Sequence, residues 1–215
     1  MTNKLLFVKI DDGCQVGNGN AGSGLVGSLV NSKIEIPPYA NIENALYPVV
    51  SLSDFCFREI SGLKSVVLPS TLKTLGTDSF WKTSITKLII PSSVEKLSSF
   101  CLSTMLQLKI LIFEGEIKEF GYRSIQTCVS LEKIYYCGMN DVSEINDPLF
   151  VDAGYEAKDP SVYVPSSYPS TWTFGSHPVL HMDVCPTKKC TCNCHNHKYS
   201  PISRVLCVSL LWVLI

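Results

Sequence analysis

Apolar residues recur along this chain with a period of 22 or 23 residues. Four equivalent segments begin at Leu63, Ile85, Leu108 and Leu131, and each carries apolar residues at its first, fourth and sixth positions. Repeats of this length are supersecondary units that bury their apolar side chains by stacking on one another. The pattern therefore predicts an elongated solenoid, a fold that favours a binding surface over a catalytic pocket.

Each period predicts a short strand, a turn, a second extended piece and a return. Pro69 and Pro91 follow the strand positions, and proline suits a strand exit because it cannot donate a ladder hydrogen bond. Strands of successive coils are expected to pair in parallel, about 4.8 Å apart, and a strand over 34–36 extends the array backward. We expect an α/β repeat: a short right-handed solenoid with parallel strands on the concave face and short strand or helical returns.

Short strings within the repeats carry a family resemblance. The apolar rhythm is the L-x-x-L-x-L of leucine-rich repeats. Leu68–Leu72 and Ile90–Val94 share a Pro-Ser turn, Thr127–Leu131 has a small-Cys-x-x-Leu joint, and Val162–Pro169 reads as a closing strand. Together these strings resemble the BspA-like leucine-rich-repeat surface proteins. The resemblance implies a leucine-rich-repeat solenoid and non-catalytic protein recognition, as in adhesion or host binding at the surface of bacteria and parasitic protists.

The sequence divides into four parts. Residues 1–33 are an irregular glycine-rich lead or an N-terminal cap, and residues 34–175 are the solenoid, with a closing strand near 162–165. Residues 176–204 are a tail rich in cysteine and histidine, and residues 205–215 are an apolar stub. Terminal units of solenoids are atypical because they cap the core, so the two ends are expected to differ from the repeats.

Strand alternation places one row of side chains on the outer face of the predicted sheet. An apolar and aromatic row on a preformed surface suits a protein partner, because contact removes the row from water. Strand propensity is the alternative explanation, since β-branched residues favour either face. The row comprises Val67, Ile89, Ile112, Tyr135 and Tyr163, continues at Glu35, and is flanked by Ser65, Lys87, Ile110 and Lys133. We expect partner binding there, with Lys87 and Lys133 adding positive charge.

Charge and motifs exclude several classes of function. The chain has 18 basic and 19 acidic residues, so it lacks the positive field that nucleic acid binding needs. Gly17, Gly19 and Gly22 match G-x-G-x-x-G, but no βαβ unit surrounds them, and a flexible loop is expected. An active site would need His177 or His181 folded against a carboxylate and a nucleophile. We predict a protein that is not an enzyme and has no cofactor.

The ten cysteines bear on the compartment. The amino terminus lacks the long apolar stretch of a secretory signal, so the thiols are expected to stay reduced. Cys56, Cys101 and Cys128 lie in the repeats, where a buried thiol packs as a small hydrophobe. We expect a cell-surface or membrane-associated protein from the resemblance, and the missing signal leaves a cytoplasmic scaffold as the alternative.

The carboxy-terminal tail holds the densest set of potential metal ligands. Zinc prefers four such ligands, but the C-x-x-C knuckles of the usual sites are missing. No metal site is therefore predicted, and lipid attachment to the thiols is an equal alternative. The eleven apolar residues 205–215 would cross about half of a hydrocarbon core, which predicts membrane contact, with a buried strand as the alternative. The candidate ligands are Cys185, Cys190, Cys192, Cys194, His195 and His197.

Overall fold

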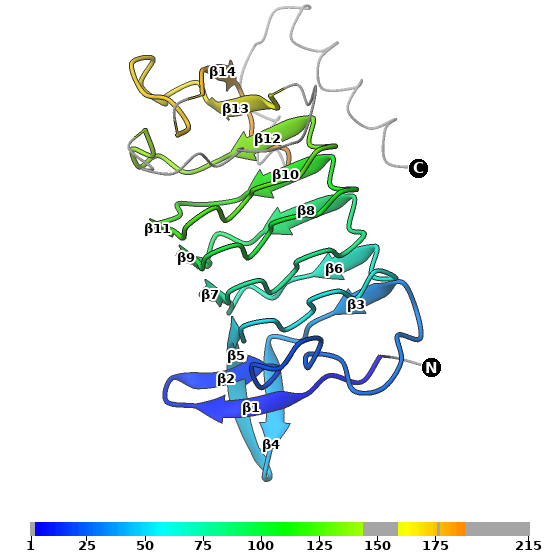
Figure 1. Cartoon of the computed structure of the whole chain (residues 1–215). Helices are drawn as coiled ribbons and strands as arrows, with labels where there is room; N and C mark the ends of the chain where they lie inside the picture. The colour runs from blue at the N-terminus through cyan, green and yellow to red at the C-terminus, as the bar shows by residue number, and fades with distance from the viewer. Residues whose placement is uncertain (1–2, 144–158, 176, 188–215) are drawn as a thin grey trace, which may run out of the picture.

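The computed structural model describes residues 3–143, 159–175 and 177–187 of the chain. Figure 1 shows a column of stacked coils, with a group of antiparallel strands at the N-terminal end. The described residues contain fourteen strands and no helix. The expected helical returns are therefore wrong for this part of the chain.

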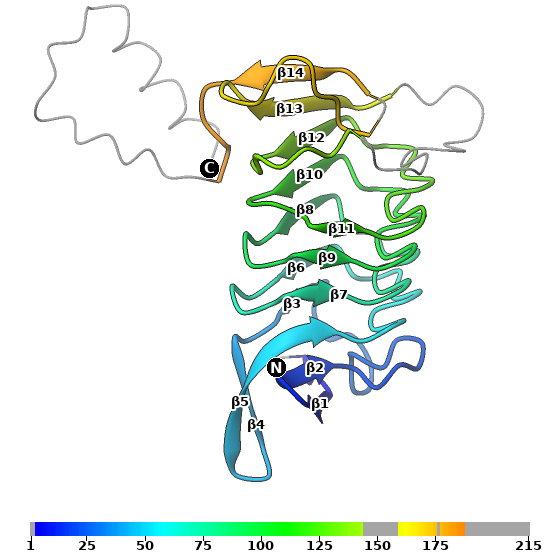
Figure 2. The ribbon, with the colours of Figure 1, turned by 90° about the vertical axis from the view of Figure 1, so that its left-hand side faces the viewer.

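One strand from each coil joins a column of parallel strands along one side of the solenoid, as Figure 2 shows. Strands β8, β10, β12, β13 and β14 form a continuous sheet, and β3 pairs with β6. Equivalent repeat positions are in register, so that Ile112 lies opposite both Ile89 and Tyr135. The predicted parallel strands, one per period, are confirmed. The column consists of β3 (Lys33–Glu35), β6 (Ser65–Val67), β8 (Lys87–Ile90), β10 (Ile110–Phe113), β12 (Lys133–Tyr136), β13 (Ser161–Pro165) and β14 (Val179–Met182).

A second, narrower sheet runs along another side of the same coils. After β5 (Ala45–Leu52), its strands β7 (Thr74–Leu75), β9 (Lys96–Leu97) and β11 (Glu119–Phe120) are only two residues long and pair in parallel. Each short strand ends with an apolar residue directed inward, of which Leu75 and Leu97 are fully buried. Two parallel ladders per coil thus enclose one core.

The N-terminal strands extend this second sheet and cover the first coil. Strands β1 (Phe7–Ile10) and β2 (Gly13–Val16) make an antiparallel hairpin, and β2 continues in parallel onto β5. Strand β4 (Tyr39–Ile42) pairs antiparallel with the first half of β5, and this hairpin projects beyond the end of the column (Figure 2). Cys14 and Val16 of β2 are fully buried, so the hairpin closes the core at this end.

The returns between coils repeat one turn geometry instead of forming helices. Two non-glycine residues in each return adopt left-handed backbone angles, with φ between 50° and 61°. Main-chain N–H groups of one return donate to carbonyls of the next coil, as from Phe57 to Ser79 at 2.8 Å and from Phe100 to Tyr122 at 2.9 Å. Because neighbouring coils satisfy these groups, no helical hydrogen bonds are needed. The left-handed residues are Phe55, Glu59, Asp78, Lys82, Phe100, Thr104, Arg123 and Thr127.

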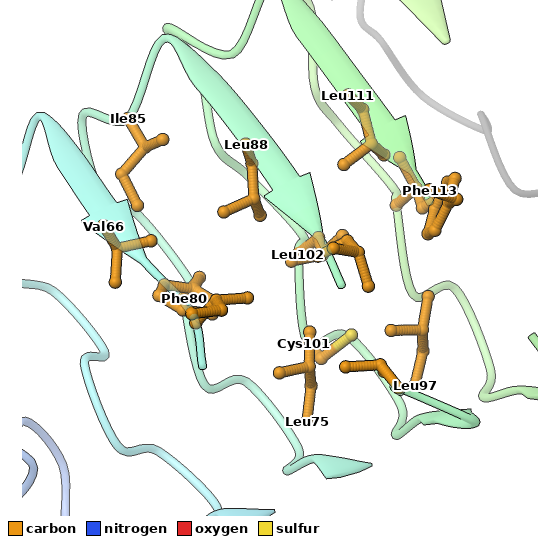
Figure 3. Packing of buried hydrophobic residues seen from close by; sticks show 14 of the residues in the cluster. Val66, Leu75, Phe80, Ile85, Leu88, Leu97, Cys101, Leu102, Leu111 and Phe113 are labelled. Carbon is orange, nitrogen blue, oxygen red and sulfur yellow. The ribbon is translucent and has the colours of Figure 1, made fainter. Parts of the chain in front are cut away.

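The core is a continuous stack of apolar layers, one for each coil. The repeat positions that open each period are buried, as Ile85, Leu88 and Leu111 illustrate in Figure 3. Phe80 and Leu102 from the returns complete the same layers (Figure 3). The periodic apolar residues of the sequence therefore form one core that grows with each added coil.

Candidate functional site

The outward side of the strand column from β3 to β14, here called the broad face, carries the predicted row. Val67 is 43% exposed and Ile89 is 37% exposed. Tyr135 and Tyr163, adjacent through the β12–β13 pairing, stack with ring centroids 5.1 Å apart. Aromatic rings stacked on a rigid sheet present a large contact area with little freedom left to lose on binding.

Ile112 departs from the predicted exposure. Its side chain points outward with the row but is only 1% exposed. It forms a separate buried cluster with Cys137 and Cys185, against which Tyr135 and Met182 also pack. The exposure expected at Ile112 is wrong, because a later part of the chain covers it.

That cover is the segment 183–187, here called the strap. After β14 the chain turns back along the column (Figure 2), and Cys185 forms a disulfide with Cys137, with 5.9 Å between the Cα atoms. Cys137 directly follows β12 and donates its N–H to the Phe113 carbonyl at 2.9 Å, so the bond anchors the strap to the sheet. The expectation that the thiols stay reduced is wrong for these two cysteines.

The two predicted lysines both lie on the broad face. Lys87 and Lys133 are exposed and lie opposite Ile110, one on each neighbouring strand. Within the described part of the chain, neither forms an ion pair within 4.0 Å. The two lysines and Ile110 thus form a second row along one side of the apolar row.

The repeat match settles the family. Residues 39–155, more than half of the chain, match six copies of the BspA type leucine rich repeat region. The chain belongs to this family. Among curated proteins, none shows significant sequence similarity to it.

Three solved structures resemble the BspA-type array. The pneumococcal vaccine antigen PcpA is 16% identical with a TM-score of 0.48, and the match covers 83% of this chain and 48% of that one. A leucine rich cell surface protein from Faecalibacterium prausnitzii is 10% identical, with a TM-score of 0.26 and coverages of 61% and 68%. A leucine-rich repeat protein from Bacteroides ovatus is 15% identical, with a TM-score of 0.23 and coverages of 84% and 70%. The chain spans about half the length of PcpA.

The remaining described cysteines of the BspA-type array are core residues. Cys14, Cys56, Cys101 and Cys128 are free thiols and all are buried. Burial raises the pKa of the Cys128 thiol to about 12 and also raises the pKa of Cys56 and Cys101. Thiols held neutral in this way are poor nucleophiles and pack as small apolar groups, as predicted for Cys56, Cys101 and Cys128.

The predicted metal candidates do not gather in the described residues. Cys185 is held in the disulfide, and Cys190, Cys192, Cys194, His195 and His197 lie outside the described residues. Over 3–143, 159–175 and 177–187, no group of three His, Cys, Asp or Glu residues is placed to hold a metal ion. The same part of the chain has no helix able to cross a membrane, and the stub 205–215 lies outside it.

The two described histidines lie near the C-terminal coils. His177 Nε2 is 3.7 Å from Asp159 Oδ1, which is an ion pair when the imidazole is protonated. His181 Nδ1 lies 3.2 Å from the Pro165 carbonyl oxygen. His177 thus meets a carboxylate, whereas the four described free thiols are buried in the solenoid core.

The glycine-rich string packs against the first return. The Gly22 N–H donates to the Phe55 carbonyl at 2.9 Å, and the Gly24 N–H donates to the Cys56 carbonyl at 2.8 Å. A Cβ atom at Gly24 would lie 2.5 Å from the Cys56 sulfur, so only glycine fits there. The loop expected around Gly17, Gly19 and Gly22 is thus docked on the array by its backbone.

The structure adds residues to the broad face that the sequence reading missed. Leu180 of β14 lies opposite Tyr163 and is 50% exposed, so it extends the row by one strand. The sequence carries only a weak signal for Leu180, because β14 follows an irregular stretch and falls within the predicted tail 176–204. The pairing of Cys137 with Cys185 had no sequence signal, since connectivity cannot be deduced from cysteine spacing alone.

Proposed function

We propose that this BspA-type array is a non-catalytic module that recognises a protein partner through its broad face. The observation that carries the proposal is the outward row of Val67, Ile89, stacked Tyr135 and Tyr163, and Leu180. Burying apolar surface contributes about 25 cal/mol per Å², and a rigid sheet loses little entropy when it is covered. The flanking lysines give the contact a polar rim.

The same proposal places the protein at a cell surface, where it serves in adhesion or partner binding. Its support is the Cys137–Cys185 disulfide, because disulfides persist in oxidising compartments and are rare in the cytosol. A cytoplasmic scaffold is the alternative, and it would require this bond to be transient. Membrane contact through residues 205–215 stays a prediction from the sequence.

Site-specific photo-crosslinking on intact cells tests the broad face. A photoreactive phenylalanine at Ile89 is expected to crosslink to one or a few proteins. The matched control carries the same residue at Leu46, which is 67% exposed on the projecting β4–β5 hairpin. Equal crosslinking patterns at the two positions would contradict the proposal.

Surface biotin labelling of cells, followed by fractionation, tests the location. The protein is expected among the labelled proteins, and its Cys137–Cys185 peptide pair is expected to be oxidised when thiols are blocked at lysis. Recovery only in the soluble cytosol with both thiols free would favour the scaffold.

A further inference from the structure

The broad face and the second sheet of β5, β7, β9 and β11, here called the narrow sheet, differ in the ion pairs that their lysines form. On the narrow sheet, Lys73 and Lys118 both contact Glu95, at 3.9 and 2.9 Å, and Lys96 contacts Glu119 at 2.7 Å. Each coil thus supplies the carboxylate for a lysine of its neighbour. The lysines on that side of the solenoid therefore pair with residues of the array itself.

On the broad face, Lys33 of β3 pairs with Glu35 at 3.6 Å, but Lys87 and Lys133 have no such partner among the described residues. Beyond β3, which contains Glu35, the strands of this face contain Lys87 and Lys133 and no carboxylate; they are β6, β8, β10, β12, β13 and β14. Acidic residues occur at the strand ends, where Glu132 pairs with Lys109 at 3.4 Å and Glu114 follows β10. Lys87 and Lys133, at the starts of β8 and β12, therefore give one edge of the apolar row a positive charge in a chain whose formal net charge is −1.

The geometry of the two lysines suits an extended chain that crosses the strands. Lys87 and Lys133 lie in register on the two neighbours of β10, two strand spacings or about 10 Å apart. Residues i, i+2 and i+4 of an extended peptide point to the same side, with i and i+4 about 13 Å apart, a span that the long lysine and glutamate side chains can close. Half-buried Ile110 lies between the two ammonium groups, where an apolar side chain of the same peptide would fit.

We propose that the partner segment bound by the broad face is an extended acidic peptide, with carboxylates on Lys87 and Lys133 and an apolar residue over Ile110. This inference rests on the proposed function, because it names the chemistry of the partner for the same surface. Complementary charge at the rim of an apolar contact mainly sets partner choice and association rate, and it is sensitive to salt.

Fluorescence anisotropy with a labelled peptide of repeating Glu-Ser-Leu-Ser units, which places Glu, Leu and the next Glu on one side, tests the proposal on the full chain. We expect saturable binding that weakens as salt rises, and no binding of the matching Gln-Ser-Leu-Ser peptide. The double variant Lys87→Ala, Lys133→Ala is expected to weaken binding about three- to tenfold, since exposed charge pairs are individually weak. The control Lys96→Ala, Lys118→Ala removes the same charge from the narrow sheet and is expected to bind like the wild type.

Three results would overturn the acidic partner. The first is no binding of the Glu-Ser-Leu-Ser peptide, and the second is equal loss of binding in both double variants. The third is lysine-dependent binding to phosphatidylserine vesicles without peptide binding, which would assign Lys87 and Lys133 to an anionic membrane. Crosslinking from Ile89 separates this failure from failure of the recognition function. If Ile89 gives specific crosslinks but the acidic peptide does not bind, the broad face still recognises a protein, and only the acidic character of the partner is wrong.

Discussion

Cys137 and Cys185 are 48 residues apart in the sequence, and their disulfide brings both into one buried cluster with Ile112 on the broad face. The bond joins the end of β12 to the strap that follows β14. It therefore closes the C-terminal coils covalently and divides the predicted partner row, with Ile89 exposed on one side of the covered position and the tyrosine stack on the other.

Breaking this disulfide is expected to destabilise the array and uncover Ile112. A loop of this length predicts a loss of about 4 kcal/mol from chain entropy, as an upper value, for the double variant Cys137→Ser, Cys185→Ser. Urea unfolding measures the loss, and hydroxyl-radical footprinting is expected to show greater oxidation of Tyr135 and Met182. Reduced wild type serves as the matched control and is expected to behave like the variant. Unchanged footprints in both would mean that other contacts hold the strap.

The ion pairs of Glu95 are expected to make the stability of the protein depend on pH in the acidic range. Its contacts with Lys118, and more weakly with Lys73, hold the pKa of this carboxyl below its ordinary value of 4.5. A lowered pKa in the folded state contributes stability above pH 4.5, and that contribution is lost as the pH falls through the folded value. Glu95→Gln is therefore expected to lower the urea midpoint slightly at pH 7 and leave it unchanged at about pH 2. A difference that persists in acid would contradict the ion-pair explanation.

Periodicity predicted the parts of this fold that depend on neighbours one coil away. Leu88, Leu111 and Ile134 are buried in register because each sits at the same repeat position, and stacking needs no further information. The returns could not be predicted in the same way, since their N–H groups bond to the next coil and not within a helix. The burial of Ile112 could not be predicted either, because the segment that covers it is distant in the sequence and does not repeat.

Close approach between returns predicts that Gly121 cannot accept a side chain. A Cβ atom there would lie 2.4 Å from Ser98 C and Ser99 N, which are backbone atoms of the preceding coil. Gly121→Ala is therefore expected to force two coils apart and cost about 1–3 kcal/mol in urea unfolding. Gly62→Ala is the control, because its Cβ would meet only the flexible end of Leu29 at 3.2 Å. Equal stability of the two variants would show that the coils can separate freely.

Small buried side chains form a column through the returns, in which cysteine and serine alternate. Cys56, Ser79, Cys101 and Ser124 occupy the same repeat position, and all are buried. Among the described residues, the hydroxyl oxygens of Ser79 and Ser124 have no hydrogen-bond partner. A buried hydroxyl without a partner carries a desolvation cost that an apolar group of similar size avoids.

Replacing either serine by alanine is therefore expected to stabilise the protein. Ser124→Ala should raise the free energy of unfolding by about 1 kcal/mol, because it removes an unsatisfied polar group and leaves only a very small void. Thr83→Val is the matched contrast, since the buried Thr83 hydroxyl donates to the Phe80 carbonyl at 3.0 Å and its loss should cost about 1 kcal/mol. Urea unfolding of both variants gives opposite signs if hydrogen-bond satisfaction decides stability here. A loss for Ser124→Ala would mean that its hydroxyl is satisfied in solution, for instance by a buried water, and that serine at this position stabilises the column.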